Sequence, residues 1–462
     1  MSFRRRQQLP LSVTLLAILL TACQPATPTL TSVPSSTKTP KPASTLAPGS
    51  GVGIPEEALK GVTIQVWIPW FGVDASLFES QAEDFNASNK WGIAVQPVSQ
   101  NNYTVLYDNV SAALATPERP QLVIAFPDHA LSWDTTGQVV ELTPYVSDPQ
   151  YGLTADEVRD FADVFWTQDT IGGRRLGVPA ERSARFLLYN ESWARELGFD
   201  SAPQNAVEFR QQACRAHQAM LIDGDRTNDG QGGWLVDTNA STFVSWMSAF
   251  GGGVLEGDSY RFLTPKNLKA LTFIKQLYDE GCAWTAQPEA DLPAAFAGRR
   301  ALFATAALEQ LPDYSRGLAA ANNADEWTVL TFPGDTQAGL VVYGSSYVIL
   351  KSTPEQQLAS WLFVRWLLSP DNQKKWVEVN GMFPLRTSAL ELLSDYQKSH
   401  PQWAQAVGLL PQAQMEPQLA SWRKVRVMIA DGFDAMFRSN TPAGRVAEIL
   451  AIMESTARDL TK

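Results

Sequence analysis

An alternation of strand-like and helix-like segments between residues 62 and 126 constrains this chain more than any other feature. Short β-rich runs are separated by two segments whose apolar side chains recur at helical spacing. The pattern predicts strands at 62–68, 92–98 and 122–126 and helices at 75–89 and 103–115. Strands that alternate with helices at this spacing are typical of βαβ units. The predicted fold class is therefore α/β with a parallel sheet.

Two loops follow the carboxyl ends of the first and third predicted strands, where open α/β sheets form their ligand crevice. These loops carry Trp70, Phe71, Asp128, His129 and Trp133. A pyranose ring offers an apolar face to an aromatic ring and offers hydroxyls to polar groups. The mixture of residue types therefore favours a sugar site.

The length of the chain predicts two lobes, because 462 residues are more than one hydrophobic core usually supports. The chain has 48 acidic and 37 basic residues, which give a net charge of -11. A field of this sign repels phosphate backbones, so we expect no nucleic-acid partner.

The N-terminus has the order of a secretory signal. Three arginines at 4–6 precede an apolar run that is too short to span a membrane. The run ends in Leu-Thr-Ala-Cys23, which resembles a bacterial lipobox, where the cysteine receives a diacylglycerol. We therefore expect a signal peptide at 1–22, a lipid on Cys23 and a Pro/Thr/Ser-rich tether at 23–56. The protein would then be extracytoplasmic and anchored to the cell membrane.

Two further cysteines, Cys214 and Cys282, lie in the predicted folded part. An even pair in an oxidising compartment favours one disulfide, and two buried free thiols are the alternative.

Eight short motifs occur in a recognisable order. They are Val66-Trp67-Ile68, Pro120-Gln121-Leu122-Val123, Gly177-Val178-Pro179, Leu188-Tyr189-Asn190-Glu191-Ser192-Trp193, Gly251-Gly252-Gly253, Phe296-Ala297-Gly298-Arg299-Arg300-Ala301, Tyr343-Gly344-Ser345-Ser346 and Trp422-Arg423-Lys424-Val425-Arg426. The series spans most of 61–460 and resembles the family 1 extracellular solute-binding proteins of bacterial ABC sugar importers, which include maltose-binding members. Gln121 departs from the family pattern, which usually has aspartate there.

The resemblance implies a periplasmic binding protein-like II fold, with two α/β lobes, a hinge and a cleft between them that closes on the ligand. It implies crossings between lobes near 177–186, 328–332 and 376–384. The expected segments are 57–182 and 330–380 for the first lobe, and 183–329 and 381–462 for the second.

The resemblance also implies ligand-binding positions. Asp128 matches a carboxylate that hydrogen-bonds sugar hydroxyls in maltose-binding members, Ser183 stands where they have glutamate, and Phe243 stands where they have tyrosine. Trp422 matches a stacking tryptophan. We expect Trp422→Ala to weaken binding at least about tenfold and to leave thermal stability nearly unchanged.

Other residues are predicted to contact the ligand although no ligand-binding position of maltose-binding members is carried over to them. Trp70 and Phe71 occupy a loop where maltose-binding members have charged groups, so the ligand need not be maltose. His129 is read as a cleft residue, and Tyr343 and Ser345 present hydroxyls or backbone amides.

The function predicted from these features is a lipid-anchored, monomeric binding subunit that delivers a mono- or oligosaccharide to an ABC permease. One alternative is a charged solute such as glycerol 3-phosphate, held by Arg185, Arg386, Arg423 or Arg426. Another is an envelope carbohydrate-active hydrolase, which would need two carboxylates flanking the scissile bond.

The chain carries no motif that predicts catalysis or a cofactor. We therefore expect a protein that is not an enzyme. A loop containing Asp223, Asp225 and Asp229 is a weak calcium candidate, because it lacks the terminal glutamate of a calcium loop and its residue types are common in turns.

Overall fold

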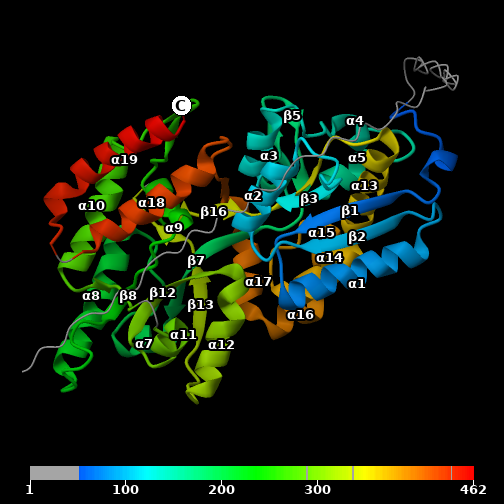
Figure 1. The fold of residues 1–462 in the computed structure, drawn as a ribbon. Coiled ribbons are helices and arrows are strands. Elements are labelled where there is room, and N and C mark those ends of the chain that lie inside the picture. The colour runs from blue at the N-terminus through cyan, green and yellow to red at the C-terminus, as the bar shows by residue number, and fades with distance from the viewer. Residues whose placement is uncertain (1–50, 288–289, 336–337, 439, 462) are drawn as a thin grey trace, which may run out of the picture. The chain divides into compact units, whose positions relative to one another are not determined.

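The computed structural model describes residues 51–287, 290–335, 338–438 and 440–461 (Figure 1). The predicted signal peptide at 1–22, the predicted lipidation site at Cys23 and most of the predicted tether lie outside the described residues. Within the described part, no helix is both long enough and apolar enough to cross a membrane.

The first sheet has five strands in the order β2-β1-β3-β17-β6. β1 is parallel to β2 and β3, whereas β17 is antiparallel to β3 and β6. Its strands and main helices are β1 (Thr63–Ile68), β2 (Ala94–Ser99), β3 (Leu122–Ala125), β6 (Val178–Pro179), β17 (Ser346–Ile349), α1 (Gly72–Ser88), α2 (Tyr103–Ala113), α3 (Pro127–Asp134), α13 (Pro354–Leu367) and α14 (Pro370–Asn380). We call these elements the first lobe. The alternation predicted between 62 and 126 is confirmed, with ends that differ by up to three residues.

The second sheet has the order β11-β8-β12-β7-β16-β18, and β13 also pairs with β7. Its strands and main helices are β7 (Ser183–Asn190), β8 (Gly232–Leu235), β11 (Ala283–Trp284), β12 (Ala301–Ala307), β13 (Trp327–Leu330), β16 (Val341–Tyr343), β18 (Gln414–Met415), α8 (Ala206–Ile222), α9 (Ala240–Ala249), α10 (Pro265–Asp279), α11 (Leu292–Ala297), α12 (Leu311–Ala320), α18 (Trp422–Met436) and α19 (Val446–Leu460). We call these elements the second lobe. Figure 1 shows α10, α18 and α19 on the same side of this sheet.

Short elements connect and cover the two sheets. They are η1 (Glu56–Leu59), α4 (Thr143–Val146), α5 (Ala155–Arg159), α6 (Asp163–Thr167), β4 (Thr170–Ile171), β5 (Arg174–Arg175), α7 (Glu191–Glu196), β9 (Leu255–Glu256), β10 (Ser259–Tyr260), η2 (Leu308–Gln310), β14 (Phe332–Pro333), β15 (Ala338–Gly339), α15 (Thr387–Glu391), α16 (Ser394–Ser399), α17 (Pro401–Leu409), η3 (Leu410–Gln412) and η4 (Ala443–Arg445).

The chain passes between the sheets three times, because it also returns to the second sheet between α14 and β18. The first two crossings pack closely against each other. The first crossing joins β6 to β7 through residues 180–182, inside the predicted region. The return was expected near 328–332, but this expectation is wrong, because β13 and β16 both pair with β7 in the second sheet. The return lies at Gly344 and Ser345, between β16 and β17. Strand-like residues alone do not reveal which sheet a strand joins.

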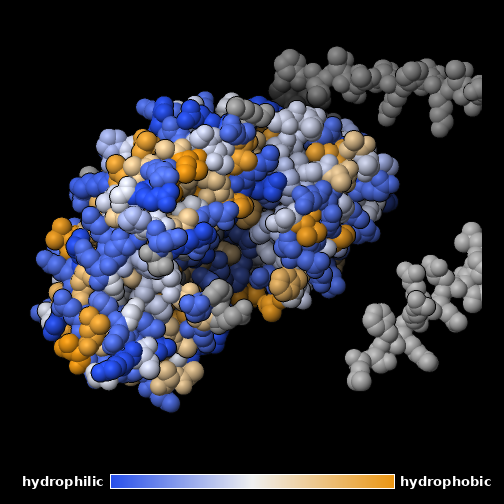
Figure 2. Space-filling model, turned by 60° about the vertical axis from the view of Figure 1, so that its left-hand side comes forward, coloured by the Kyte–Doolittle hydropathy of each residue, from blue (hydrophilic) through white to orange (hydrophobic). Residues whose placement is uncertain are grey.

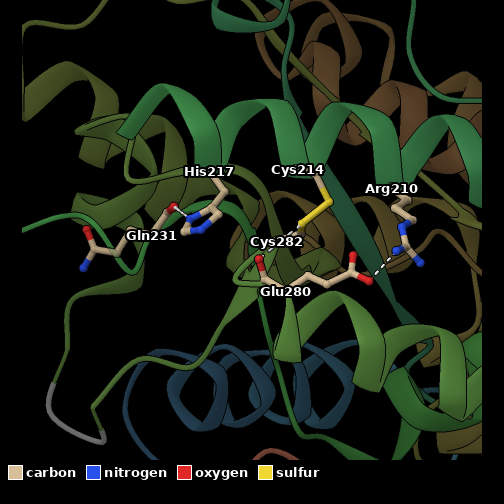
Figure 3. The surroundings of a disulfide bond; sticks show 6 residues. All are labelled: Arg210, Cys214, His217, Gln231, Glu280 and Cys282. Carbon is tan, nitrogen blue, oxygen red and sulfur yellow. Dashed lines mark hydrogen bonds and ion pairs between the residues drawn. A yellow bond between two sulfur atoms is a disulfide. The ribbon is translucent and has the colours of Figure 1, made fainter. Parts of the chain in front are cut away.

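A disulfide joins Cys214 on α8 to Cys282, directly before β11 (Figure 3). Nearby, Arg210 on the same helix forms an ion pair with Glu280, and the backbone carbonyl of Gln231 lies 3.0 Å from Nδ1 of His217. The bridge therefore fixes the edge strand of the second sheet to the helix that covers it.

Replacing both Cys214 and Cys282 by alanine should lower the free energy of unfolding by about 4 kcal/mol. The bridge closes a loop with a sequence separation of 68, so it removes conformational entropy from the unfolded chain. Urea unfolding of the double variant, compared with oxidised and reduced wild type, measures this loss. Equal midpoints for all three samples would contradict the prediction.

Candidate ligand-binding site

Two arginines on α18 of the second lobe reach the first lobe. The guanidinium carbon of Arg423 lies 4.2 Å from the ring centre of Tyr107 on α2, and that of Arg426 lies 5.0 Å from the ring centre of Phe126. Such cation–π contacts are attractive, and more so when water is excluded. The two lobes therefore meet where α18 faces α2 and α3. Figure 2 shows one face of the molecule with a hollow near its middle, where hydrophilic residues gather.

Asp128 and His129 form the first turn of α3, directly beyond the carboxyl end of β3, and both side chains are buried. Burial raises the pKa of Asp128 to about 6, with Arg426 acting in the opposite direction and Glu416 adding to the increase. Burial, together with Arg423 and Arg426, lowers the pKa of His129 to about 3. His129 is therefore uncharged at pH 7, and Asp128 faces charged groups of the second lobe.

Trp70 and Phe71 follow β1 but differ in their surroundings. Trp70 is buried against Trp376 and Phe78, with ring centres 4.8 and 5.6 Å away. It is a core residue, which corrects its prediction as a ligand platform. Phe71 is 73% exposed at the start of α1, so its ring is available to a ligand or to solvent.

Ser183, Arg185 and Tyr343 lie together on neighbouring strands of the second sheet, because Tyr343 on β16 is in register with Ser183 on β7. Ser183 donates a hydrogen bond of 2.6 Å to Glu309. Arg185 forms an ion pair of 2.8 Å with Asp237. Burial raises the pKa of Tyr343, so its hydroxyl stays protonated and able to donate. These strands thus bring hydroxyl, carboxylate and guanidinium groups to one place.

Trp422 begins α18, and its indole Nε1 donates a hydrogen bond of 3.1 Å to the buried Glu416. Its ring is stacked on that of Tyr260, with centres 6.5 Å apart. Phe243 is fully buried and packs on Phe433 of α18, so the structure assigns it to the core rather than to a ligand contact.

Ser345 lies in the return crossing and contacts a group that the sequence did not single out. The buried carboxylate of Glu181, in the first crossing, accepts hydrogen bonds from Tyr103, Ser345 and Asn380 at 3.0, 3.2 and 3.4 Å. None of these donors carries a charge. The packing here is close, since a Cβ added to Gly344 would lie 2.0 Å from the backbone oxygen of Glu181.

The Glu181→Gln variant should lose part of the pH dependence of stability. Burial raises the pKa of Glu181 from 4.5 to about 7. Between these values the native state holds a proton that the unfolded chain releases, so stability falls by about 3 kcal/mol as the pH rises through this window. Urea unfolding at several pH values should give a flatter profile for the variant. The exposed control is Glu79→Gln. If the stability of Glu181→Gln changes with pH as steeply as that of wild type and of this control, the prediction is wrong.

Two other sequence candidates do not belong to the site. Arg386 is held 3.3 Å from Asp160 and donates to the backbone carbonyls of Glu157 and Leu368. In the candidate calcium loop, Asp223 and Asp225 accept hydrogen bonds from residues of that same loop. The three loop carboxylates do not form a close group of side-chain ligands in this structure, and the calcium site stays a weak prediction.

Four site residues were missed by the sequence argument: Tyr103, Glu181, Glu309 and Glu416. Glu181 lies within the crossing predicted at 177–186, and this position could have identified it. Tyr103 follows the carboxyl end of the parallel strand β2, so the rule that indicates Asp128 could also have indicated it. Glu309 and Glu416 reach the site through long-range packing, for which the local sequence gives no signal.

The profile of the bacterial extracellular solute-binding proteins matches residues 80–409, which is more than half of the chain. A Brucella abortus (strain 2308) protein described as a binding protein is 22% identical over 305 residues, 63% of this chain and 70% of the relative. The sn-glycerol-3-phosphate-binding periplasmic protein UgpB of Salmonella typhimurium is 22% identical over 354 residues, 73% of this chain and 77% of the relative.

Among solved structures, the sugar-binding protein MalE of Xanthomonas citri has a TM-score of 0.73 at 18% identity, covering 87% of this chain and 97% of MalE. This likeness shows the predicted two-lobed α/β fold. These relatives are solute-binding proteins and not enzymes. The chain belongs to the bacterial extracellular solute-binding protein family.

Proposed function

We propose that this protein binds a neutral carbohydrate between its lobes and delivers it to the permease of an ABC importer. One observation carries the proposal. Asp128 of the first lobe faces Arg426 and Glu416 of the second lobe, and Glu416 also holds the indole of Trp422. Carboxylate and guanidinium groups that face one another across the lobes suit the hydroxyl rim of a sugar. The sugar-binding relative MalE supports the same class of ligand.

The charges around the site favour a neutral ligand over a phosphorylated one. Arg185 is paired with Asp237, and Arg426 lies 3.6 Å from Glu416. Glu181 has only uncharged donors around its carboxylate. A phosphate would add negative charge to a site whose cations are already engaged.

Glycerol 3-phosphate is the second candidate, because UgpB is among the relatives. This ligand would require Arg423 to exchange its contact with Tyr107 for a contact with phosphate.

We also propose that Cys23 carries the lipid anchor, that the protein is monomeric and that ligand binding closes the lobes. The lipobox-like segment at the end of the apolar run supports the anchor. Metabolic labelling with palmitate should mark the wild type and leave Cys23→Ala unlabelled. Equal labelling of both would refute the anchor.

Isothermal titration with glucose, maltose and maltotriose tests the site. Asp128→Asn should weaken the binding of any sugar that the wild type binds by at least about tenfold, because a charge-assisted hydrogen bond is lost. The control Asp431→Asn, on an exposed position of α18, should bind as wild type does. If Asp128→Asn and Asp431→Asn bind the sugar with equal affinity, Asp128 does not contact the ligand. Recovery of the sugar in altered form would instead favour the hydrolase alternative.

A further inference from the structure

The three connections between the lobes are tied together around Glu181 and Arg182. In the first crossing, the backbone N–H of Glu181 donates a hydrogen bond of 3.1 Å to the carbonyl of Ser345 in the second crossing. The third connection begins after α14, and the backbone N–H of its Phe383 donates a bond of 3.0 Å to the carbonyl of Arg182. A hinge movement is absorbed by a few residues of such connections, so Glu181 lies where the lobes would turn against each other.

The side chain of Glu181 joins the same connections. It is buried, and its carboxylate accepts hydrogen bonds from Ser345 and from Asn380, the last residue of α14. Tyr103 at the start of α2 is the third donor. The hydroxyls of Tyr103 and Ser345 can accept as well as donate, and the amide of Asn380 can still donate to the carbonyl oxygen of a neutral carboxyl group. This network therefore persists when Glu181 carries a proton.

The charged groups around Glu181 do not compensate a negative charge on its carboxylate. Burial raises the pKa of Glu181 most, and Asp74 of α1 and Glu309 of η2 add to the increase because their charges have the same sign. Tyr347 of β17 stays protonated, since burial raises the pKa of its phenol. Arg182 is the neighbouring cation, but its guanidinium is engaged in a buried ion pair of 2.8 Å. An ionised Glu181 is therefore unfavourable while the lobes are in contact.

We propose that Glu181 is a proton-dependent switch of lobe closure, whose neutral form favours the closed arrangement and whose ionised form favours an open arrangement in which water reaches the carboxylate. Closing removes this water and leaves the group among like charges, so closing is coupled to the uptake of a proton. By linkage, a ligand that binds the closed form binds more tightly as the pH falls. The proposal rests on the proposed function in one respect, which is that the lobes close around a ligand.

Small-angle X-ray scattering of the ligand-free full chain tests the switch without any sugar, at about pH 6.5 and about pH 8.5. Asp128, with a pKa of about 6, is mostly ionised throughout this range, whereas Glu181 titrates within it. The radius of gyration of wild type should be larger at the higher pH. Glu181→Gln resembles the protonated form and should give the smaller radius at both.

The exposed control Glu79→Gln should change its radius with pH as wild type does. The proposal is overturned if the radius of wild type is the same at both pH values. It is also overturned if Glu181→Gln changes as much as wild type, because another group would then drive the movement.

Isothermal titration with glucose, maltose and maltotriose, in buffers of different ionisation enthalpy, measures the coupled proton. At about pH 7, wild type should take up about half a proton per sugar bound, because Glu181 is about half protonated in the closed form and almost fully ionised in the open form. Affinity should be about fourfold lower at pH 8.5 than at pH 6.5. Both effects should be lost in Glu181→Gln.

The two experiments separate the switch from the proposed function. Sugar binding with the same proton uptake in wild type and Glu181→Gln would overturn the switch and leave the proposed function intact. If none of the three sugars binds, this result counts against the proposed function, and the scattering result decides by itself whether Glu181 controls closure.

Discussion

Replacing Asp169 by alanine is expected to lower the free energy of unfolding by about 3–5 kcal/mol, because it leaves the buried charge of Arg182 without its partner. Arg182 is fully buried in the first crossing and forms an ion pair of 2.8 Å with Asp169. Its guanidinium also donates to the backbone carbonyls of Glu181 and Ser345, which lie in the two crossings. The variant therefore disturbs the place where both crossings pack together.

Urea unfolding followed by circular dichroism measures this loss. Asp156→Ala is the matched control, because Asp156 pairs with Arg159 in solvent on α5. Exposed pairs contribute about 0–1 kcal/mol, so the control should unfold close to wild type. A loss in Asp169→Ala as small as that in the control would show that the buried pair does not hold the crossings.

Trp422→Ala is expected to reduce both stability and ligand affinity. The side chain is 1% exposed, so its removal should lower the free energy of unfolding by about 3–5 kcal/mol. Affinity should fall at least about tenfold, because the ring and its partner Glu416 lie where α18 faces the first lobe. The burial corrects the expectation from sequence that thermal stability would stay nearly unchanged.

Trp422→Phe separates the two effects. It keeps one aromatic ring at this position and removes the second ring of the indole together with the hydrogen bond to Glu416, so it should lose less stability than Trp422→Ala. Urea unfolding and isothermal titration on the same samples give both quantities. If Trp422→Ala unfolds like wild type, the ring is not part of the second-lobe core.

The local sequence predicts the first segment of the first lobe well, because its strands and helices alternate and each has an unambiguous period. Residues 62–126 illustrate this, since every element there is confirmed. The sequence also indicates the loop that carries Asp128, because ligand crevices follow the ends of parallel strands.

Residues that depend on long-range packing could not be placed in the same way. Trp70 and Phe243 have side chains that suit a sugar site, yet both are enclosed by the core. Glu309 and Glu416 reach the site from segments far from the predicted loops. The burial of an aromatic ring and the partner of a carboxylate depend on segments that are distant in the chain.

A thermal-shift panel tests the central claim most directly. The purified protein would be melted with mono- and oligosaccharides, polyols, glycerol 3-phosphate and amino acids, each at high concentration. A ligand at about 100 times its dissociation constant adds about 2.7 kcal/mol to the folded state, which raises the melting temperature by a few degrees. We predict a shift with a neutral sugar that is recovered unchanged. A shift with glycerol 3-phosphate or amino acids and with no sugar would contradict a carbohydrate-binding site.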